Sequence, residues 1–289
     1  MSDVATSTVS VNGVSSPILQ AGDPRSTEAV VFVHGNPGPK EDWQDLLQRT
    51  NEFGRAVAPD MPGYGAADKP RDFDYTSEGY ARHLAGILDQ LGIERVHLVM
   101  HDFGGAWGLV WAVQHPSAFA SATLINTGVL LDYRWHRLAR IWRTRGLGDV
   151  FMATATRPPF RFLLSHDNPR LSPAAVDGIY DASRRWPTKR AVLKLYRATP
   201  ATAMGALRDP LHELDRPALV VWGTDDVYIP WRQADRQRES FPSARVQLLE
   251  GLGHWPFLED PARVAEHVIP FLREQVRVSQ PDPLGAGQV

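Results

Sequence analysis

Short apolar runs rich in β-branched residues alternate along this chain with longer stretches whose apolar residues recur at helical spacing. Each run is brief, continuous and bounded by turn residues, as is typical of strands buried on both faces of a parallel sheet. The alternation predicts an α/β fold with a mostly parallel, doubly wound sheet and helices on both faces. The predicted strands are Ala29–Val33, Arg55–Ala58, Val96–Met100, Ala122–Ile125, Ala218–Trp222 and Val246–Leu249, and the predicted helices are Glu78–Leu91, Ala106–Val113 and Pro261–Leu272.

The alternation stops after Thr127 and resumes at Pro217. The intervening stretch is rich in Arg and Trp, is helical in pattern and has no clear strand. Because open α/β sheets bind ligands at the C-terminal edge of their strands, an insertion there is expected to cover the site as a cap. The predicted organisation is an α/β core over residues 1–128 and 212–278, a helical cap over 129–211 and a flexible tail over 279–289.

Composition excludes several classes of function. The formal net charge of −2 argues against nucleic-acid binding and against a basic membrane-binding surface. The chain has no cysteine, which rules out disulfides, thiolate catalysis and cysteine-based metal sites. We expect no metal and no cofactor. The N-terminal segment lacks the features of a signal peptide and no apolar run approaches ~18 residues, so we expect a cytoplasmic protein. The oligomeric state stays open.

Four polar segments follow predicted strands, each at or just after the strand's end. Because the carboxyl ends of parallel strands meet at one edge of the sheet, we expect the four segments to lie together there. They are His34–Pro37, His101–Gly105, Gly223–Asp226 and Gly253–Pro256.

Asp102 is the predicted nucleophile. It lies between a strand and a helix, where a sharp turn lifts one side chain above the sheet, and Gly104 and Gly105 allow the helix to approach the strand closely. An aspartate here also suits a helix N-cap. The three other polar segments favour the catalytic interpretation. Turns of this kind usually have a small residue two positions before the nucleophile, and this chain has Met100 there.

The predicted partners of Asp102 are His254 and an acid. His254 follows the last predicted strand in a short loop that can reach the turn. Two adjacent residues, Asp225 and Asp226, are candidates for the acid. The spacing from Gly223 and to Pro230 favours Asp226, with Asp225 as a solvated or turn-capping neighbour.

An aspartate nucleophile indicates attack on an sp³ carbon. A carboxylate needs no base for this displacement, and the product is an alkyl ester. His254, oriented by Asp226, then activates a water molecule, and this water attacks the ester carbonyl carbon. The backbone N–H of Phe103 and one from the turn around Asn36 are expected to stabilise the oxyanion. Epoxides and carbon–halogen bonds suit this scheme, so we expect a small apolar organic substrate that reacts with water.

These segments resemble the α/β-hydrolase superfamily, and more narrowly its epoxide hydrolase and haloalkane dehalogenase branches, over roughly residues 29–128 and 217–272. The chain order of nucleophile, acid and histidine matches that of the superfamily. The segments Asp60–Gly65 and Asp68–Pro70 look like the loop that these branches share. The resemblance implies an α/β-hydrolase fold with an inserted helical cap.

The two branches stabilise the leaving group differently. The pair Tyr196-Arg197 looks like the pair that carries a ring-opening tyrosine in epoxide hydrolases, with Tyr133 or Tyr180 as a second tyrosine. Asn36 matches a halide donor of dehalogenases, but Phe103 stands where that branch commonly has a Trp whose ring N–H holds the halide. The resemblance therefore favours an epoxide hydrolase.

The alternatives come from three classes. The first is a dehalogenase-like hydrolase, and the second is a receptor on the same fold with a non-catalytic triad. The third, an esterase or a lyase, normally has serine in place of Asp102. Pro37, Tyr133 and Trp255 are expected to line the substrate pocket.

Overall fold

An eight-stranded sheet forms the centre of the computed structural model, which describes residues 4–200 and 202–279. The strand order is β1-β2-β4-β3-β5-β6-β7-β8. β2 is antiparallel to both of its neighbours, and every later pairing is parallel. The strands are β1 Ala5–Val11, β2 Val14–Ala21, β3 Glu28–Val33, β4 Arg55–Pro59, β5 Arg95–His101, β6 Phe119–Ile125, β7 Ala218–Gly223 and β8 Arg245–Leu249.

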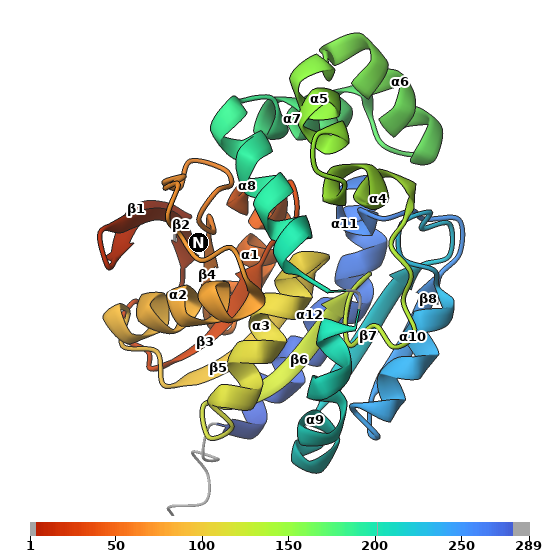
Figure 1. The fold of residues 1–289 in the computed structure, drawn as a ribbon. Coiled ribbons are helices and arrows are strands. Elements are labelled where there is room, and N and C mark those ends of the chain that lie inside the picture. The colour runs from red at the N-terminus through yellow and green to blue at the C-terminus, as the bar shows by residue number, and fades with distance from the viewer. Residues whose placement is uncertain (1–3, 201, 280–289) are drawn as a thin grey trace, which may run out of the picture.

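Helices cover both faces of the sheet, as the sequence predicts (Figure 1). One face packs against α2 and α3, and the other packs against α1 and α12. The core helices are α1 Gln44–Thr50, α2 Ser77–Gln90, α3 Phe103–Gln114, α9 Arg208–Leu214, α10 Arg232–Arg236, α11 Pro256–Glu259 and α12 Pro261–Ser279, with short 3₁₀ helices η1 Lys40–Trp43, η2 Ala203–Leu207 and η3 Gln237–Glu239.

Five helices between β6 and β7 form the inserted cap, and they lie together at one end of the sheet in Figure 1. They are α4 Arg137–Arg143, α5 Leu147–Thr154, α6 Arg157–Asp167, α7 Pro173–Ser183 and α8 Trp186–Ala198. α9 runs across the predicted junction between residues 211 and 212. Of the predicted tail, Ser279 is the last residue of α12, and residues 280–289 lie outside the described residues.

The α/β fold class is confirmed, and the sequence missed only the N-terminal hairpin among the described strands. In β1 the exposed and buried positions largely alternate, because one face of this edge strand is solvated. Such a strand lacks the continuous apolar run on which the prediction depended.

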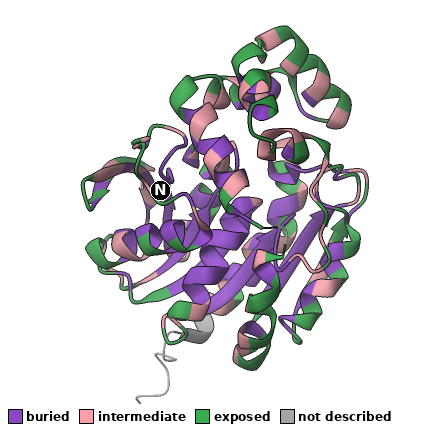
Figure 2. Cartoon of the chain, viewed as in Figure 1, coloured by how far each residue is buried: buried purple, intermediate pink, exposed green. Residues whose placement is uncertain are grey.

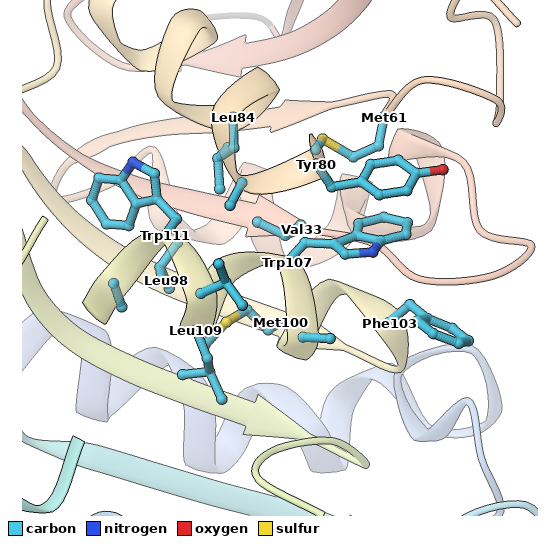
Figure 3. Close-up of a cluster of buried hydrophobic side chains, with 14 of the residues drawn as sticks. Val33, Met61, Tyr80, Leu84, Leu98, Met100, Phe103, Trp107, Leu109 and Trp111 are labelled. Atoms are coloured by element: carbon cyan, nitrogen blue, oxygen red, sulfur yellow. The ribbon is translucent and has the colours of Figure 1, made fainter. Parts of the chain in front are cut away.

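α3 is the most buried of the core helices, and it sits under the candidate nucleophile. Every residue from Phe103 to Ala112 is buried, so the helix is apolar on all sides. The ring of Trp107 stacks on that of Tyr80, with 4.0 Å between the ring centroids (Figure 3). Figure 2 shows the contrast between this buried layer and the largely exposed or half-buried cap. The N-terminus of α3 is therefore fixed rigidly against the sheet.

Candidate active site

Asp102 occupies a sharp turn between β5 and α3. Its backbone angles, φ 50° and ψ −127°, are ones that residues other than glycine rarely adopt. Two hydrogen bonds hold its carbonyl oxygen, one from the Thr127 hydroxyl at 2.5 Å and one from the Gly105 N–H at 3.1 Å. The surrounding structure thus maintains a strained conformation, as is common at functional sites.

Glycines make room for this turn. A Cβ atom on Gly35 would lie 2.4 Å from the Cβ of Asp102, and one on Gly104 would lie 2.2 Å from the carbonyl oxygen of Val33. The large residue before the turn is also accommodated. A Cβ on Gly108 of α3 would lie 2.5 Å from the sulfur of Met100, so the glycine supplies the space that Met100 needs.

We expect Gly35→Ala to lower catalytic activity by about 10²-fold, since displacing a reacting group by about 1 Å has an effect of that size. The added methyl group collides with the Asp102 side chain, so one of them must move. Steady-state kinetics with thermal unfolding on the same samples would measure the effect. Gly178→Ala is the matched control, because a Cβ there meets nothing within 4 Å. Unchanged activity in Gly35→Ala would contradict the assignment of Asp102.

His254 lies between two carboxylates. Its Nδ1 is 2.8 Å from Oδ2 of Asp226, and its Nε2 is 3.6 Å from Oδ2 of Asp102. Asp226 is buried, and its Oδ1 accepts the backbone N–H groups of Tyr228 and Ile229 at 2.8 and 2.9 Å. Asp225 is exposed. The structure therefore brings Asp226, and not Asp225, to the histidine.

His101 and Asn126, to which the sequence analysis gave no role, help to hold the loops of His254 and Asp226 in place. Nε2 of His101 lies 2.8 Å from the carbonyl oxygen of His254, and burial lowers the pKa of His101 to about 3, so the neutral ring donates this hydrogen bond. The side-chain amide of Asn126 donates to Oδ2 of Asp226 at 2.8 Å. Both residues are polar at the C-terminal end of a predicted strand, which is a signal that could have identified them.

Charge determines the protonation of His254. Burial disfavours its protonation, but the negative charge of Asp226 and the hydrogen bonds with Asp102 and Asp226 outweigh burial and raise its pKa to about 10. For Asp102, burial favours the neutral acid, yet the hydrogen bond and charge of His254 hold its pKa below the usual value. At neutral pH the site therefore holds an imidazolium ion between two carboxylates.

The two oxygens of Asp102 have different surroundings. Oδ1 accepts the backbone N–H of Asn36 at 2.7 Å, whereas Oδ2 faces His254. Phe103 begins α3, where a backbone N–H has no partner within the helix. The N–H of Asn36 therefore already binds Oδ1, and the N–H of Phe103 lies at the positive end of the α3 dipole, directly after Asp102.

A cavity of about 340 Å³ between core and cap contains these groups. Asn36, Asp102, Tyr196 and His254 are among the residues that line it, and apolar side chains of the cap make up most of the rest. The predicted pocket residues fall in two places. Pro37 and Trp255 line this cavity, as does Tyr180.

Tyr133 lines a neighbouring cavity of about 50 Å³ that also reaches Asp102. Its hydroxyl donates to the carbonyl oxygen of Tyr228 at 3.1 Å. Its proton is therefore engaged by the backbone, which does not suit the role of a second proton donor.

Tyr196 presents a buried hydroxyl to the large cavity. The side-chain amide of Asn36 donates to this hydroxyl at 3.5 Å, and no acceptor in residues 4–200 or 202–279 takes the tyrosine's own proton. Burial, followed by the charge of Asp102, raises the pKa of Tyr196 well above its usual value. The hydroxyl stays protonated and is free to donate.

His136 is a second donor, and the sequence analysis missed it. It lines the same cavity, and burial lowers its pKa to about 4. Its Nδ1 accepts the backbone N–H of Ala139 at 3.3 Å, because His136 is the N-cap of α4. The proton of the neutral ring is therefore on Nε2. Its position just before a helical stretch was the available signal.

Two indole N–H groups also lie in this region. Nε1 of Trp135 and Nε1 of Trp142 are buried without a hydrogen-bond partner in the described part of the chain. Both rings contact Tyr196, with centroid distances of 5.4 and 4.9 Å.

Residues 4–200 and 202–279 contain no group of three His, Cys, Asp or Glu side chains arranged to hold a metal ion. None of their helices has the length and apolar character needed to cross a membrane.

The chain belongs to the α/β hydrolase fold family, whose sequence model matches residues 28–261. It is 28% identical to a 2-hydroxy-6-oxo-2,4-heptadienoate hydrolase of Pseudomonas putida, over 83% of this chain and 85% of the relative. It is also 28% identical to a cis-3-alkyl-4-alkyloxetan-2-one decarboxylase of Xanthomonas campestris, over 90% and 92%. Its fold matches that of an epoxide hydrolase from Vigna radiata, with a TM-score of 0.76, 18% identity and coverage of 94% and 98%.

Proposed function

We propose that this protein is an epoxide hydrolase that acts through an ester on Asp102. The observation that carries the proposal is the free hydroxyl of Tyr196 in the cavity that also contains Asp102. An epoxide oxygen leaves as an alkoxide, a strong base, and therefore needs a hydroxyl or N–H donor at the moment the ring opens. Tyr196 supplies one, and His136 supplies a second from the same cavity.

In the first step, Oδ2 of Asp102 attacks a ring carbon. The carbon–oxygen bond of the epoxide breaks, and its electron pair stays on the ring oxygen, which takes the hydrogen bond and then the proton of Tyr196. The product is a hydroxyalkyl ester of Asp102. Oδ1 is held by the backbone N–H of Asn36, which leaves Oδ2 as the attacking atom.

In the second step, the ester is hydrolysed. Ester formation removes the negative charge of Asp102, which is one of the causes of the high pKa of His254. That pKa therefore falls, and the imidazolium loses a proton that returns, through water, to the phenolate of Tyr196. The neutral imidazole can then accept a proton from the attacking water. Water attacks the ester carbonyl carbon, and the oxyanion forms at Oδ1 beside the N–H groups of Asn36 and Phe103. As the tetrahedral intermediate breaks down, the proton of its new hydroxyl passes to the departing alkoxide oxygen. Release of the diol restores the carboxylate of Asp102 and the imidazolium of His254, so the net reaction adds one water to the epoxide.

The activities named for the curated relatives fit the site less well. Attack of a carboxylate on a carbonyl carbon gives an anhydride, which stores more energy than the ester that a hydroxyl nucleophile would form. The carboxylate at position 102 instead suits an sp³ carbon.

We expect Tyr196→Phe to slow ester formation from epoxides by about 10²–10⁴-fold, because it removes only the donor hydroxyl. Rapid-quench measurement of the first turnover would show the loss, and thermal unfolding should change little. Tyr133→Phe is the matched control, because its hydroxyl bonds to the backbone. Full epoxide activity in Tyr196→Phe would overturn the proposed role of this residue.

A second candidate is a haloalkane dehalogenase, favoured by the unpartnered indole N–H groups of Trp135 and Trp142. A departing halide is stabilised by N–H donors, and these lie beside Tyr196. Halide release measured beside diol formation separates the candidates. Release of halide from haloalkanes, with no reaction of epoxides, would establish this second function.

A further inference from the structure

Lys189 lies on the wall of the large cavity, away from the nucleophile. Lys189, Val192 and Tyr196 all belong to α8 and all line the cavity. Their spacing of three and four residues puts them on one face of the helix. Lys189 is seven residues before Tyr196, which separates the two Cα atoms by about 10 Å along the helix axis. One helix face therefore carries the proposed proton donor at one end and a cation at the other.

The ammonium group of Lys189 has no ionic partner among the described residues. It donates to the carbonyl oxygens of Met152 and Ala155, at 2.7 and 3.2 Å, at the C-terminal end of α5. An ammonium has three donors, so one N–H remains. Burial lowers the pKa of Lys189, with no carboxylate to offset that effect. Of the other cations that line the cavity, Arg184 pairs with Asp181 at 3.0 Å, and the imidazolium of His254 lies between Asp102 and Asp226.

The cavity between these ends is apolar. Side chains such as Leu138, Met152, Leu163 and Val192 line it, and Asp102 is the only carboxylate among the described residues on its wall. A ligand with a charge in the middle would lose its hydration without compensation. An apolar chain with an anionic group at one end matches both the lining and the position of the lysine.

We propose that the substrate is an epoxide carried on an apolar chain whose far end is a carboxylate, bound by Lys189. This inference rests on the proposed function of the site. The separation of about 10 Å between Lys189 and Tyr196 corresponds to a chain of roughly six to ten carbon atoms, given carbon–carbon bonds of about 1.5 Å. The carboxylate accepts the remaining N–H of Lys189, while the epoxide lies between Asp102 and Tyr196.

Binding of unreactive probes tests the inference without any chemistry at the epoxide. We expect decanoate to bind the wild-type protein about ten-fold more tightly than methyl decanoate in calorimetric titrations, since a hydrogen bond to a charged group has an effect of this size. Lys189→Met should remove the preference and Lys189→Arg should retain it. Lys194→Met is the matched control, because Lys194 is on the same helix but does not line the cavity.

The outcomes separate this inference from the proposed function. Equal binding of the two probes by the wild type, or an unchanged preference in Lys189→Met, overturns the role of Lys189 even if epoxides are hydrolysed. A third outcome is that the wild type prefers decanoate in a way that depends on Lys189 and yet hydrolyses no epoxide. That result supports the carboxylate site and refutes the proposed epoxide hydrolysis. If Lys189→Met unfolds at a lower temperature, Lys189→Arg alone decides, and loss of the preference in that folded variant refutes the inference.

Discussion

Asp102→Asn is expected to reduce turnover by at least about 10⁴-fold while the protein keeps its fold. The amide has nearly the shape of the carboxylate but is a poor nucleophile. The turn itself should persist, because the bonds from Thr127 and Gly105 go to the backbone carbonyl of residue 102 and not to its side chain. Diol formation measures activity, and circular dichroism checks the fold.

The variant must be studied freshly purified, because deamidation restores the aspartate. Mass spectrometry of the peptide that contains residue 102 controls for this. Activity close to that of the wild type, with asparagine intact, would exclude Asp102 as the nucleophile. Asp225→Asn is a useful comparison, because that carboxylate is exposed and should have no such effect.

His254→Gln is expected to block the second step and spare the first. Ester formation uses the carboxylate of Asp102 and the hydroxyl of Tyr196 and needs no base, whereas hydrolysis needs a base to deprotonate water. Glutamine cannot serve as that base. The variant should therefore accumulate the ester, with overall turnover lower by about 10²–10⁴-fold. Intact-protein mass spectrometry after incubation with substrate detects the intermediate.

The size of the mass increase also identifies the reaction. An epoxide adds its whole mass to Asp102, because ring opening expels nothing. A haloalkane adds only its alkyl part, because the halide leaves. Asp102→Asn combined with His254→Gln should remain unlabelled. Labelling of that double variant, or normal turnover by His254→Gln, would contradict an ester on Asp102.

The sequence by itself determined the fold and the general position of the site. Continuous apolar runs predict parallel strands, and parallel strands bring their carboxyl ends to one edge. Segments as distant as Asn36, Asp102 and His254 could therefore be expected to meet. The β1–β2 hairpin was missed because a half-solvated edge strand has no such run.

Only the tertiary structure decided which polar groups meet and which are already engaged. Asp225 and Asp226 differ little in sequence, but the loop after β7 turns one to solvent and the other to His254. Tyr133 and Tyr196 are both tyrosines of the segment between β6 and β7, but packing gives the proton of Tyr133 to a backbone carbonyl and leaves that of Tyr196 free. Periodicity fixes the face of an element on which a residue lies. The partner that a side chain reaches depends on loop paths and on how the cap packs over the sheet, which periodicity does not encode.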